Sequence, residues 1–490
     1  MSQKSIQFGT DGWRAIIAEQ FTFDNAELVT RAIAQYIVNR FGTEKPVVVG
    51  HDLRFLADKF AHRSAEILTE YGLTVQMTDT WYPTPVVAYV AKYHDTAGAM
   101  MFTASHNPPE YLGIKFIPEY AGPALPDITD VLVENVRELE LGPKETNNAW
   151  ARFVKQGVTP QAIQSIAPRK EYEDFLANHI DFEKIRAAKP LKIMFDAMYG
   201  CAQGYVDGFL RELGHDVTSL HCEQRADFGG TMPEPIAQYL PEMVSRVAAE
   251  GYSYGLASDG DGDRFGVVDD KGNFVGANQM LPMVLRHLYK NKGIRGNVVR
   301  SLATSKLIDR LAEQYGDVDV IETPVGFKWM GKAMREQNII VGGEESGGFS
   351  IQGHIPEKDG VLAALVITEM LVYENKPLSQ IWADTVAEAG MEFHNFAKNF
   401  HISDAQKKST VELLKSKKAG DSFAGLTIDN IDTRDGVKFN FSKYVWLTVR
   451  PSGTEPVLRV YLEATDAATC QQLQTAVLEL IEKQPATCSV

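Results

Sequence analysis

Three carboxylates at alternate positions give the clearest chemical signal in this sequence. Asp259, Asp261 and Asp263 lie in the segment Asp-Gly-Asp-Gly-Asp-Arg, where the glycines allow the backbone to fold around a hard cation. Carboxylates this close repel one another unless a cation neutralises them. Three protein ligands leave coordination positions open, as Mg²⁺ requires when it also binds a phosphate. The spacing therefore predicts a magnesium site.

Two other interpretations of the aspartate segment are weaker. An EF-hand calcium loop needs glycine at its sixth position and glutamate at its twelfth, where this chain has Arg264 and Asp270. Strand-like segments also flank the loop in place of helices. A solvated acidic turn is the simplest alternative, and the repulsion among three unpaired carboxylates disfavours it.

A serine in a second polar loop could carry a phosphoryl group that the cation also binds. Ser105 lies in Thr-Ala-Ser-His-Asn-Pro, which is not the G-x-S-x-G turn of an α/β-hydrolase. Alone, a serine before Asn-Pro is more often a turn residue. Adjacency to His106 predicts no dyad, because neighbouring side chains on extended backbone point to opposite sides. Beside the aspartate loop, however, a phosphorylated Ser105 could fill an open position of the cation, which would activate the phosphoryl group for transfer.

Two further loops could bind a phosphorylated sugar. Glu344 and Ser346 lie in a glycine-rich turn and could pair with vicinal hydroxyls, although an exposed acidic loop is an equally simple interpretation. The second loop could bind a phosphate dianion through a guanidinium group, hydroxyls and backbone donors. Its residues are Arg450, Ser452, Gly453 and Thr454. No G-x-x-x-x-G-K-[ST] or G-x-G-x-x-G segment is present, so no nucleotide site is indicated.

The elements that must position these loops follow a repeated order. Residues 24–42 predict a helix, followed by a strand at 46–50, a helix that ends at Gly72, and strands at 73–77 and 97–102. This order favours a parallel sheet. A helix, a glycine and a strand recur around Gly214 and Gly316, too far apart for a solenoid repeat. We infer three related α/β domains.

The carboxyl-terminal part has a different pattern. Strands are predicted at 426–431, 437–441, 445–449 and 457–462, before a helix at 467–483. The predicted fold is therefore three related α/β domains with mixed, mainly parallel sheets plus a C-terminal α+β domain. The domains are predicted at residues 1–168, 169–274, 275–387 and 388–490. Ligand loops are expected beyond the carboxyl ends of the strands.

Composition excludes several classes of partner. Of 490 residues, 49 are Lys or Arg and 64 are Asp or Glu, for a net charge of −15. This charge disfavours binding to nucleic acid or to anionic membranes. No signal peptide and no apolar run of about 20 residues, as a membrane span would need, is found. The four cysteines are far apart without a C-x-x-C pair, which favours a reducing cytoplasm and indicates neither disulfides nor zinc. No obligate protein partner is apparent.

Taken together, the motifs resemble the α-D-phosphohexomutase superfamily of phosphoglucomutases, phosphomannomutases and phosphoglucosamine mutases. The likeness extends from Phe-Gly-Thr-Asp-Gly-Trp-Arg at 8–14 to Arg-Pro-Ser-Gly-Thr at 450–454. It implies four domains around a central cleft, each contributing one loop. It also implies that Ser105 is a phosphoserine and that the three aspartates bind magnesium together with its phosphate. Glu344 and Ser346 would contact the sugar, and the 450–454 loop would hold the phosphate that is not reacting.

The resemblance also implies roles for other charged residues. Matches to charged positions of the family's cleft are Arg14, Lys115, Arg264 and Lys328. Lys115 is a candidate general base and His106 is the alternative. His354 and Lys358 lie in a stretch similar to that of the phosphoglucomutases. Gly348 departs from the pattern, because many relatives have histidine there; this leaves the acid/base partner open and favours glucose phosphates.

The implied activity is reversible phosphoryl transfer between the 1- and 6-positions of a hexose phosphate. Transfer would pass through the phosphoserine and a hexose 1,6-bisphosphate, which also serves as activator. Glucose phosphates are the first expectation, with mannose phosphates as another option. The alternatives are a hexose 1,6-bisphosphate synthase, a phosphoglucosamine mutase, a metal-dependent sugar phosphatase and a non-catalytic phosphosugar sensor.

Overall fold

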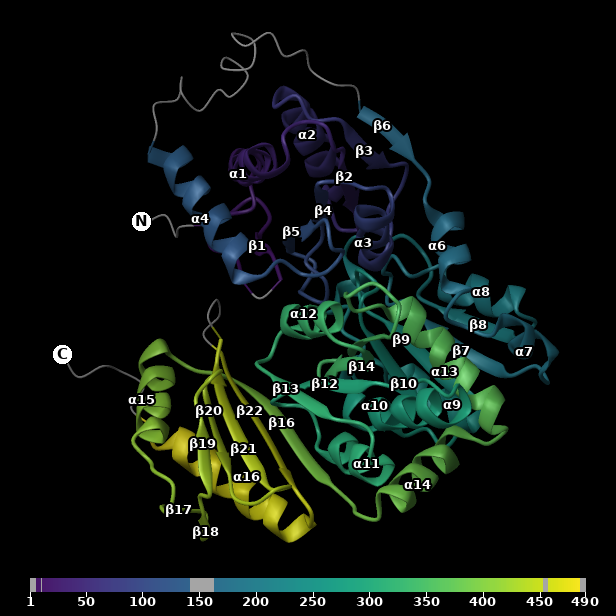
Figure 1. Ribbon diagram of the computed structural model, residues 1–490, viewed down its shortest axis with the longest axis vertical. Helices are drawn as coiled ribbons and strands as arrows, with labels where there is room; N and C mark the ends of the chain where they lie inside the picture. The colour runs from purple at the N-terminus through teal and green to yellow at the C-terminus, as the bar shows by residue number, and fades with distance from the viewer. Residues whose placement is uncertain (1–5, 10, 142–162, 453–456, 485–490) are drawn as a thin grey trace. The chain divides into compact units, whose positions relative to one another are not determined.

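The computed structural model describes residues 6–9, 11–141, 163–452 and 457–484 (Figure 1). The chain groups into two compact units. The first comprises Met1–Arg295 with Gly326–Trp382, and the second comprises Gly296–Val325 with Ala383–Val490. The four sequence-based domain boundaries stay a prediction, whereas the α/β fold with a C-terminal α+β part is confirmed.

A six-stranded mixed sheet begins the first unit, in the order β1-β5-β4-β2-β3-β6. The strands are β1 (Trp13–Ile16), β2 (Val47–His51), β3 (Val75–Thr78), β4 (Gly98–Phe102), β5 (Tyr111–Pro118) and β6 (Ile163–Ile166). β2 is parallel to β3 and β4, and β3 is parallel to β6. β5 is antiparallel to β1 and β4. Ser105 therefore follows β4 at the carboxyl end of a central strand.

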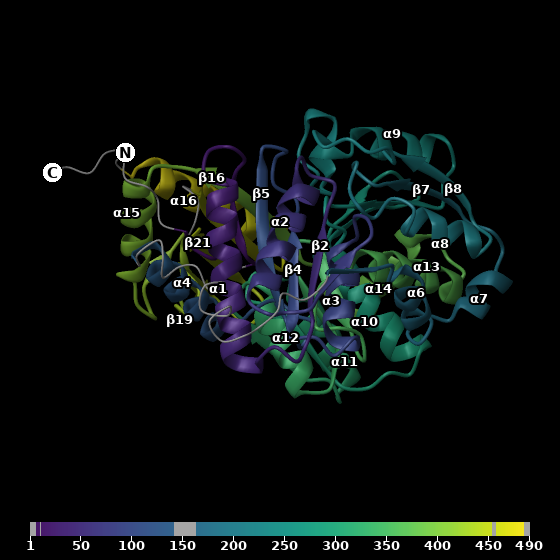
Figure 2. The same ribbon diagram turned by 90° about the horizontal axis from the view of Figure 1, so that it is seen from above.

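Helices cover both faces of this sheet (Figure 2). They are α1 (Phe23–Phe41), α2 (Ala57–Glu70), α3 (Thr84–Tyr93) and α4 (Pro126–Leu141). Val47 and Val49 of β2 join the core shared with α1, α2 and α4. Gly50, on the opposite face, leaves room for Val87 of α3, since an added Cβ would lie 2.6 Å from that side chain. Strand alternation thus buries both faces.

The next sheet positions the aspartate loop. Its order is β11-β10-β9-β7-β8, with β7 parallel to β8 and β9 and with β10 antiparallel to β9 and β11. The strands are β7 (Lys192–Asp196), β8 (Asp216–Leu220), β9 (Tyr254–Ser258), β10 (Phe265–Val268) and β11 (Phe274–Val275). The helices nearby are α6 (Arg169–Leu176), α7 (Phe182–Ala187), α8 (Val206–Glu212) and α9 (Pro241–Ala249). Residues 259–264 form the turn between β9 and β10.

A hairpin completes the first unit. β14 (Ile339–Glu344) pairs with β15 (Gly348–Ile351) in antiparallel register, so Glu344 lies opposite Gly348. The accompanying helices are α10 (Ala277–Arg286), the π-helix η3 (His287–Asn291), α12 (Phe327–Glu336) and α13 (Gly360–Glu374). α13 is buried from Gly360 to Leu371. The apolar run at its start is therefore a core helix, and no helix among the described residues has the length and apolar character to cross a bilayer.

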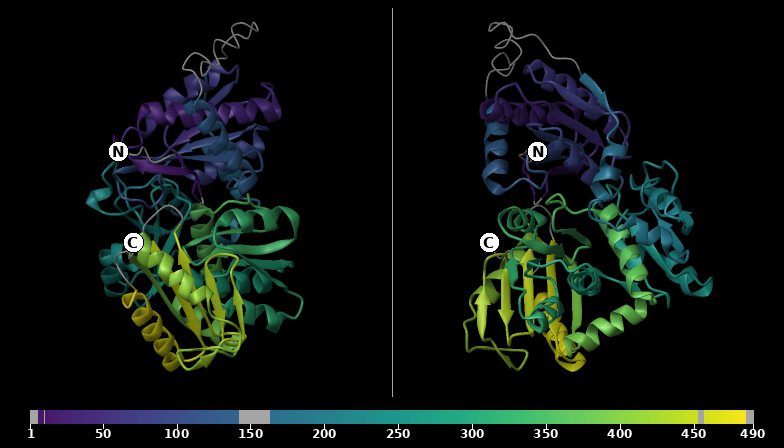
Figure 3. Two further views of the ribbon diagram at one scale, coloured as in Figure 1. Left: turned by 90° about the vertical axis from the view of Figure 1, so that its left-hand side faces the viewer. Right: turned by 45° about the vertical axis from the view of Figure 1, so that its right-hand side comes forward.

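The second unit combines a parallel pair with an antiparallel sheet (Figure 3). β12 (Asn297–Ser301) and β13 (Val320–Thr323) are parallel and joined by α11 (Leu307–Tyr315). The sheet has the order β16-β22-β21-β20-β19, with every pairing antiparallel. Its strands are β16 (His394–His401), β19 (Asn430–Asp432), β20 (Val437–Asn440), β21 (Trp446–Pro451) and β22 (Val457–Ala464). Its helices are α15 (Asp404–Lys415) and α16 (Ala467–Glu482).

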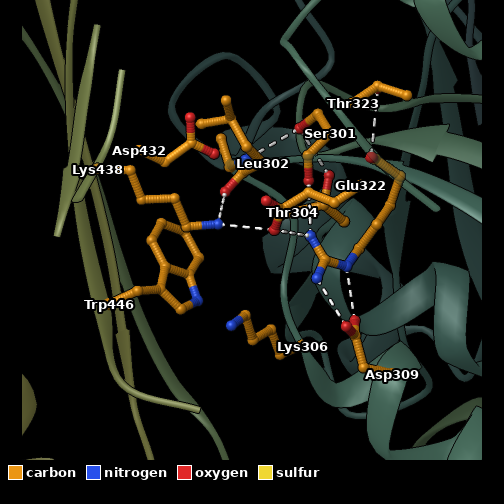
Figure 4. Close-up of polar contacts among 12 residues, drawn as sticks. Ser301, Leu302, Thr304, Lys306, Asp309, Glu322, Thr323, Asp432, Lys438 and Trp446 are labelled. Carbon is orange, nitrogen blue, oxygen red and sulfur yellow. Dashed lines mark hydrogen bonds and ion pairs between the residues drawn. The ribbon is translucent and has the colours of Figure 1, made fainter. Parts of the chain in front are cut away.

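A polar network joins the parallel pair to the antiparallel sheet (Figure 4). Glu322 accepts hydrogen bonds from Arg300 Nη1 at 2.9 Å and from Lys438 Nζ at 2.8 Å. Arg300 also binds Asp309 through two nitrogens, at 2.6 and 2.7 Å. Lys438 donates a second hydrogen bond to the Leu302 carbonyl at 2.8 Å. Paired charges at low exposure explain why residues 296–325 group with the carboxyl-terminal sheet.

The three helix-ending glycines predicted from the sequence are confirmed. Gly72, Gly214 and Gly316 have φ values of 77°, 92° and 77°. A side chain is strained in this left-handed region, so glycine ends the helix and turns the chain toward the next strand. Prediction missed β16, in which polar and charged side chains leave little apolar alternation.

Candidate active site

The predicted phosphoserine and the aspartate loop lie in direct contact. Ser105 Oγ donates a hydrogen bond to Asp259 Oδ2 at 2.8 Å, although the two residues are 154 positions apart in the chain. Both belong to the first compact unit, and both are buried. A hydroxyl and a cluster of acidic ligands therefore share one site, which is the arrangement that phosphoryl transfer requires.

The backbone of the serine loop is turned sharply at Ser105. Its φ of 52° is left-handed, a conformation that few residues with side chains adopt. The Ser105 N–H donates to Thr103 Oγ1 at 2.8 Å. His106 Nδ1 lies 3.4 Å from Ser105 Oγ. The expectation that these neighbours point apart was wrong, because it assumed extended backbone.

Backbone and side-chain donors hold the aspartate loop in place. Asp259 Oδ1 accepts the N–H groups of Asp263 and Arg264, each at 3.0 Å. Thr84, at the start of α3, donates its hydroxyl to Asp261 Oδ2 at 2.7 Å and its N–H to the Asp261 carbonyl at 2.8 Å. The start of α3 and the backbone of the loop itself thus share in positioning the carboxylates.

The three aspartates fit a hard divalent cation. Their carboxylate oxygens lie within 4.8 Å of one another, and all three residues are buried. Among the described residues, Asp261 Oδ1 and Asp263 Oδ1 have no hydrogen-bond partner. Burial and the neighbouring charges of Asp261 and Asp263 raise the pKa of Asp259 well above its usual range. Orphaned buried carboxylate oxygens are the ligands that Mg²⁺ prefers.

Lys115 counters the charge of the aspartates. Its Nζ lies 2.8 Å from Asp11 and from Asp261, and 2.9 Å from Asp263. Burial lowers the pKa of Lys115, but the three carboxylates outweigh burial and raise that pKa well above its usual value. This arrangement keeps Lys115 protonated and favours it as a charged clamp on the carboxylates. A cation on the same oxygens would compete with it.

Lys358 supplies a second buried cation. Its Nζ lies 3.2 Å from Asp263 and from Glu357. A Cβ added to Gly348 would lie 2.4 Å from Lys358 Cδ and 2.7 Å from its Cγ. The Lys358 chain therefore fills the space that a side chain at 348 would need, which gives a physical reason for glycine at this position.

The predicted sugar-binding turn lies between β14 and β15. Glu344 is 5% exposed, and its Oε1 accepts the Gly326 N–H at 2.7 Å. Burial, with the nearby charge of Glu345, raises the pKa of Glu344 to about 7. Ser346 is exposed. The Phe265 N–H donates to the Gly347 carbonyl at 2.8 Å, which ties this turn to the strand that follows the aspartate loop.

Other predicted residues differ in their surroundings. Arg14 Nη1 donates to the Ala104 carbonyl at 3.1 Å and to Asn107 Oδ1 at 2.7 Å. Arg264 is half-buried, with its Nε 3.9 Å from Asp263. Lys328 is half-buried in the first turn of α12.

His354 has no exposed side-chain surface. Its Nε2 lies 2.8 Å from Asp359 Oδ2, and its ring stacks on Phe175 at 5.2 Å. Asp359 also accepts a hydrogen bond from Tyr172. This burial favours support of the Lys358 segment over direct contact with a substrate.

The predicted phosphate loop belongs to the second unit. Arg450 is 8% exposed, and its Nε donates to Asp435 Oδ2 at 2.6 Å. Ser452 is half-buried and its N–H donates to the Val457 carbonyl at 2.9 Å. Gly453 and Thr454 lie outside the described residues.

Sequence inspection missed three residues of the site. Asp11 binds Lys115 and stands in the amino-terminal motif, so that motif could have indicated it. Glu357 directly precedes Lys358 in the stretch that resembles the phosphoglucomutases, so that stretch could also have indicated it. Thr84 lies in a segment without a recognisable pattern, and only the fold brings it to Asp261.

Comparison with known proteins identifies the family. Four phosphoglucomutase/phosphomannomutase profiles match: α/β/α domain I at residues 5–142, domain II at 170–272, domain III at 276–389 and the C-terminal domain at 398–480. The solved structure of a candidate phosphomannomutase from Thermus thermophilus is 32% identical, with a TM-score of 0.82, over 97% of this chain and 99% of that chain. The chain belongs to the α-D-phosphohexomutase superfamily.

Other phosphohexomutases align along the whole chain. A phosphoglucomutase/phosphomannomutase of Thermococcus kodakarensis is 28% identical over 97% of this chain and 98% of its own. A phosphoglucosamine mutase of Carboxydothermus hydrogenoformans is 29% identical over 97% and 99%. This phosphohexomutase is therefore an enzyme of the isomerase type, and membership of the family does not determine its sugar.

Proposed function

We propose that this phosphohexomutase interconverts hexose 1-phosphates and 6-phosphates through phosphorylated Ser105, with glucose phosphates preferred and mannose phosphates as further substrates. The observation that carries the proposal is the 2.8 Å hydrogen bond between Ser105 Oγ and Asp259 within a buried aspartate cluster. Phosphoglucosamine mutase activity is the second candidate, because relatives with that name match over the same length.

Proton handling can be assigned to residues next to the serine. When the free Ser105 hydroxyl attacks a phosphate of a hexose 1,6-bisphosphate, the serine O–P bond forms and the sugar O–P bond breaks. The serine proton can pass to Asp259 Oδ2 at 2.8 Å or to His106 Nδ1 at 3.4 Å, and one proton returns to the departing sugar oxygen, which leaves as a hydroxyl. Lys115 and Lys358 place two buried positive charges beside the carboxylates.

The aspartates would hold Mg²⁺, which when bound supplies charge that polarises the phosphoryl oxygens. In the reverse step a sugar hydroxyl takes the phosphoryl group from Ser105, which gives the bisphosphate. The bisphosphate must then reorient in the site before its other phosphate is transferred back to Ser105. Glu344, Ser346 and Lys328 are proposed to recognise the sugar. Arg450 and its loop are proposed to hold the phosphate that is not reacting.

A single experiment tests this function. The purified chain is incubated with glucose 1,6-bisphosphate and Mg²⁺, and intact-mass analysis is combined with a coupled mutase assay. We expect one phosphoryl group on Ser105 and conversion of glucose 1-phosphate to glucose 6-phosphate. Release of inorganic phosphate without isomerisation would show a phosphatase, and accumulation of bisphosphate from a phosphorylated donor would show a synthase.

The sugar is decided by comparing substrates. Steady-state rates on glucose, mannose and glucosamine 1-phosphates separate the two candidates. Hexose 1,6-bisphosphate as activator, a cytoplasmic location and the lack of an obligate protein partner stay predictions from the sequence.

A further inference from the structure

Arg54 lies in the short segment between β2 and α2, next to the serine loop. Its side chain has no exposed surface, so it cannot touch a substrate. Resting on the function proposed above, we propose that Arg54 is the positioning residue that holds the Ser105 loop in its transfer-competent shape. No motif in the sequence pointed to it.

The two terminal nitrogens of Arg54 bind this loop. Nη2 donates to the carbonyls of Ser105 at 2.6 Å and Asn107 at 2.7 Å. Nη1 donates to the carbonyls of Pro108 at 2.8 Å and Tyr111 at 3.0 Å. The terminal nitrogens of an arginine carry four N–H groups, and here four carbonyls of one loop receive them. The bond to the Ser105 carbonyl is fully buried, and loss of a hydrogen-bond donor to a buried carbonyl costs free energy.

The loop needs such a clamp because of its conformation. Ser105 has a φ of 52°, in the left-handed region that few residues with side chains adopt. A non-glycine residue in this region persists only when its surroundings fix it. The bond from Arg54 to the Ser105 carbonyl acts on the same residue whose hydroxyl reaches Asp259. Loss of the clamp would let the hydroxyl leave the aspartate cluster.

Asp52 and Phe228 hold the Arg54 side chain in place. Its Nε lies 3.3 Å from Asp52 Oδ2, and Asp52 Oδ1 accepts the Arg54 N–H at 2.9 Å. The ring of Phe228 covers the guanidinium at 4.8 Å. A Cβ on Gly260 would lie 2.5 Å from the Ser105 carbonyl oxygen, so the aspartate loop packs against the same carbonyl that Arg54 binds. Arg54 therefore helps to fix the position of the serine loop relative to the aspartate loop.

The test uses the full chain with Arg54→Lys. Lysine keeps the charge but has three donors on one nitrogen and cannot reproduce a planar fork to four carbonyls. Dephosphorylated protein is mixed with glucose 1,6-bisphosphate, and the rate of Ser105 phosphorylation is followed by intact mass. We expect at least about a 30-fold slower rate, since small misplacements of reacting groups cost this much or more. Binding of glucose 6-phosphate, measured by calorimetry, should change less than about threefold, because Arg54 touches no ligand.

The matched control is Arg63→Lys, an arginine of α2 whose side chain is 39% exposed and paired with Glu27. Its rate and affinity should stay within about twofold of the wild type, as for other exposed pairs. An Arg54→Lys rate within about threefold of the wild type, or a loss of sugar affinity as large as the loss of rate, would overturn the proposal.

A second variant tests the proposal if Arg54→Lys does not fold. Asp52→Asn keeps the shape of the side chain but removes the charge beside Nε, and we expect the same separation of rate from affinity at smaller size. An unchanged rate in a folded Asp52→Asn variant then overturns the role of Arg54. Wild-type protein that takes no phosphoryl group refutes the proposed function itself, so the two failures are distinguishable.

Discussion

Ser105 combines a left-handed backbone with a hydroxyl that is already bound to an acidic ligand cluster. The φ of 52° and the 2.8 Å bond to Asp259 describe one residue held by its surroundings against its own preference. Strain of this kind is tolerated where the position of a side chain matters more than local stability. Predictions at the residue scale therefore concern rate and recognition.

Ser105→Ala should abolish transfer while sparing the fold. Removal of the nucleophile is expected to lower kcat by at least about a thousandfold, the size seen when other enzymes lose theirs. Intact mass should show no phosphoryl group after incubation with glucose 1,6-bisphosphate. Ser245→Ala, which removes an exposed helix hydroxyl bound to the Glu242 carbonyl, serves as control. Ordinary turnover by Ser105→Ala would remove the phosphoserine from the mechanism.

Glu344→Gln should weaken sugar recognition and alter pH dependence. Loss of a charged acceptor is expected to lower kcat/KM for the preferred sugar about 10–100-fold. Burial, together with Glu345, raises the pKa of Glu344 from 4.5 to about 7. The folded state therefore binds an extra proton between these values, and the contribution of this group to stability is full at low pH and lost as the pH rises through about 7.

Chemical denaturation of the wild type and Glu344→Gln at about pH 5 and about pH 8, on either side of the folded-state pKa, measures this effect. The wild type should lose stability relative to the variant on going from the lower to the higher pH. An equal change in both proteins would contradict the assignment of that titration to Glu344.

Segments far apart in the chain meet at the scale of elements. The turn between β14 and β15 is tied to β10 through Phe265 and Gly347, and Gly360 at the start of α13 donates to the Gly262 carbonyl at 3.0 Å. Close backbone approaches leave no space for side chains at several of these contacts. Single methyl groups are therefore informative probes.

Gly348→Ala should displace Lys358 from Asp263. The added methyl would overlap the Cγ and Cδ of a buried lysine chain, which has little room to move. We expect kcat to fall about 10–100-fold, because Nζ would no longer hold its charge beside the carboxylates. Gly276→Ala is the control, since its Cβ would meet Phe274 at an ordinary 3.7 Å. Equal activity in both variants would show that the path of Lys358 is adaptable.

Glu322→Gln should weaken the second unit, most clearly near neutral pH. Burial raises the pKa of Glu322, but Arg300 and Lys438 outweigh it and lower that pKa from 4.5 to about 2. A folded-state pKa below the unfolded value gives stability that is present above pH 4.5 and lost as the pH falls toward about 2.

The expected loss for Glu322→Gln at about pH 7 is about 1–3 kcal/mol, below that of a fully buried pair because this side chain is partly exposed. Denaturant titration at about pH 7 and about pH 3 measures it, and the difference from wild type should shrink at the lower pH. Glu412→Gln, on the surface of α15, is the control. A difference that does not depend on pH would show that the ion pairs contribute little.

The chain as a whole contains separate cores. One surrounds the sheet of β1–β6 in the first unit, and another surrounds the antiparallel sheet of the second. Units with their own cores can unfold separately, so the protein is not expected to behave as a two-state system.

Calorimetry should accordingly resolve more than one unfolding transition. Val49→Ala in the first core and Val460→Ala in the second are each expected to destabilise their own unit by about 1–3 kcal/mol. Each variant should lower a different transition. A single transition whose calorimetric and van't Hoff enthalpies agree, shifted equally by both variants, would show that the two units unfold together.

Whatever depends on contiguous residues was determined by the sequence itself. The aspartate trio, the serine loop and the helix-ending glycines are local patterns, because ligand spacing and left-handed turns are set by neighbouring residues. The division into α/β parts and a carboxyl-terminal α+β part was also readable, since periodicity reports which faces are buried.

Only the tertiary structure decided what these patterns do together. It brought Ser105 to Asp259 across 154 positions. It placed the Lys115 ammonium group among the carboxylates of Asp11, Asp261 and Asp263. It also packed the side chain of Lys358 against Gly348. It also paired residues 296–325 with the carboxyl-terminal sheet and placed Arg54 beneath the serine loop. Such contacts depend on packing between distant segments, for which a single sequence carries no local signal.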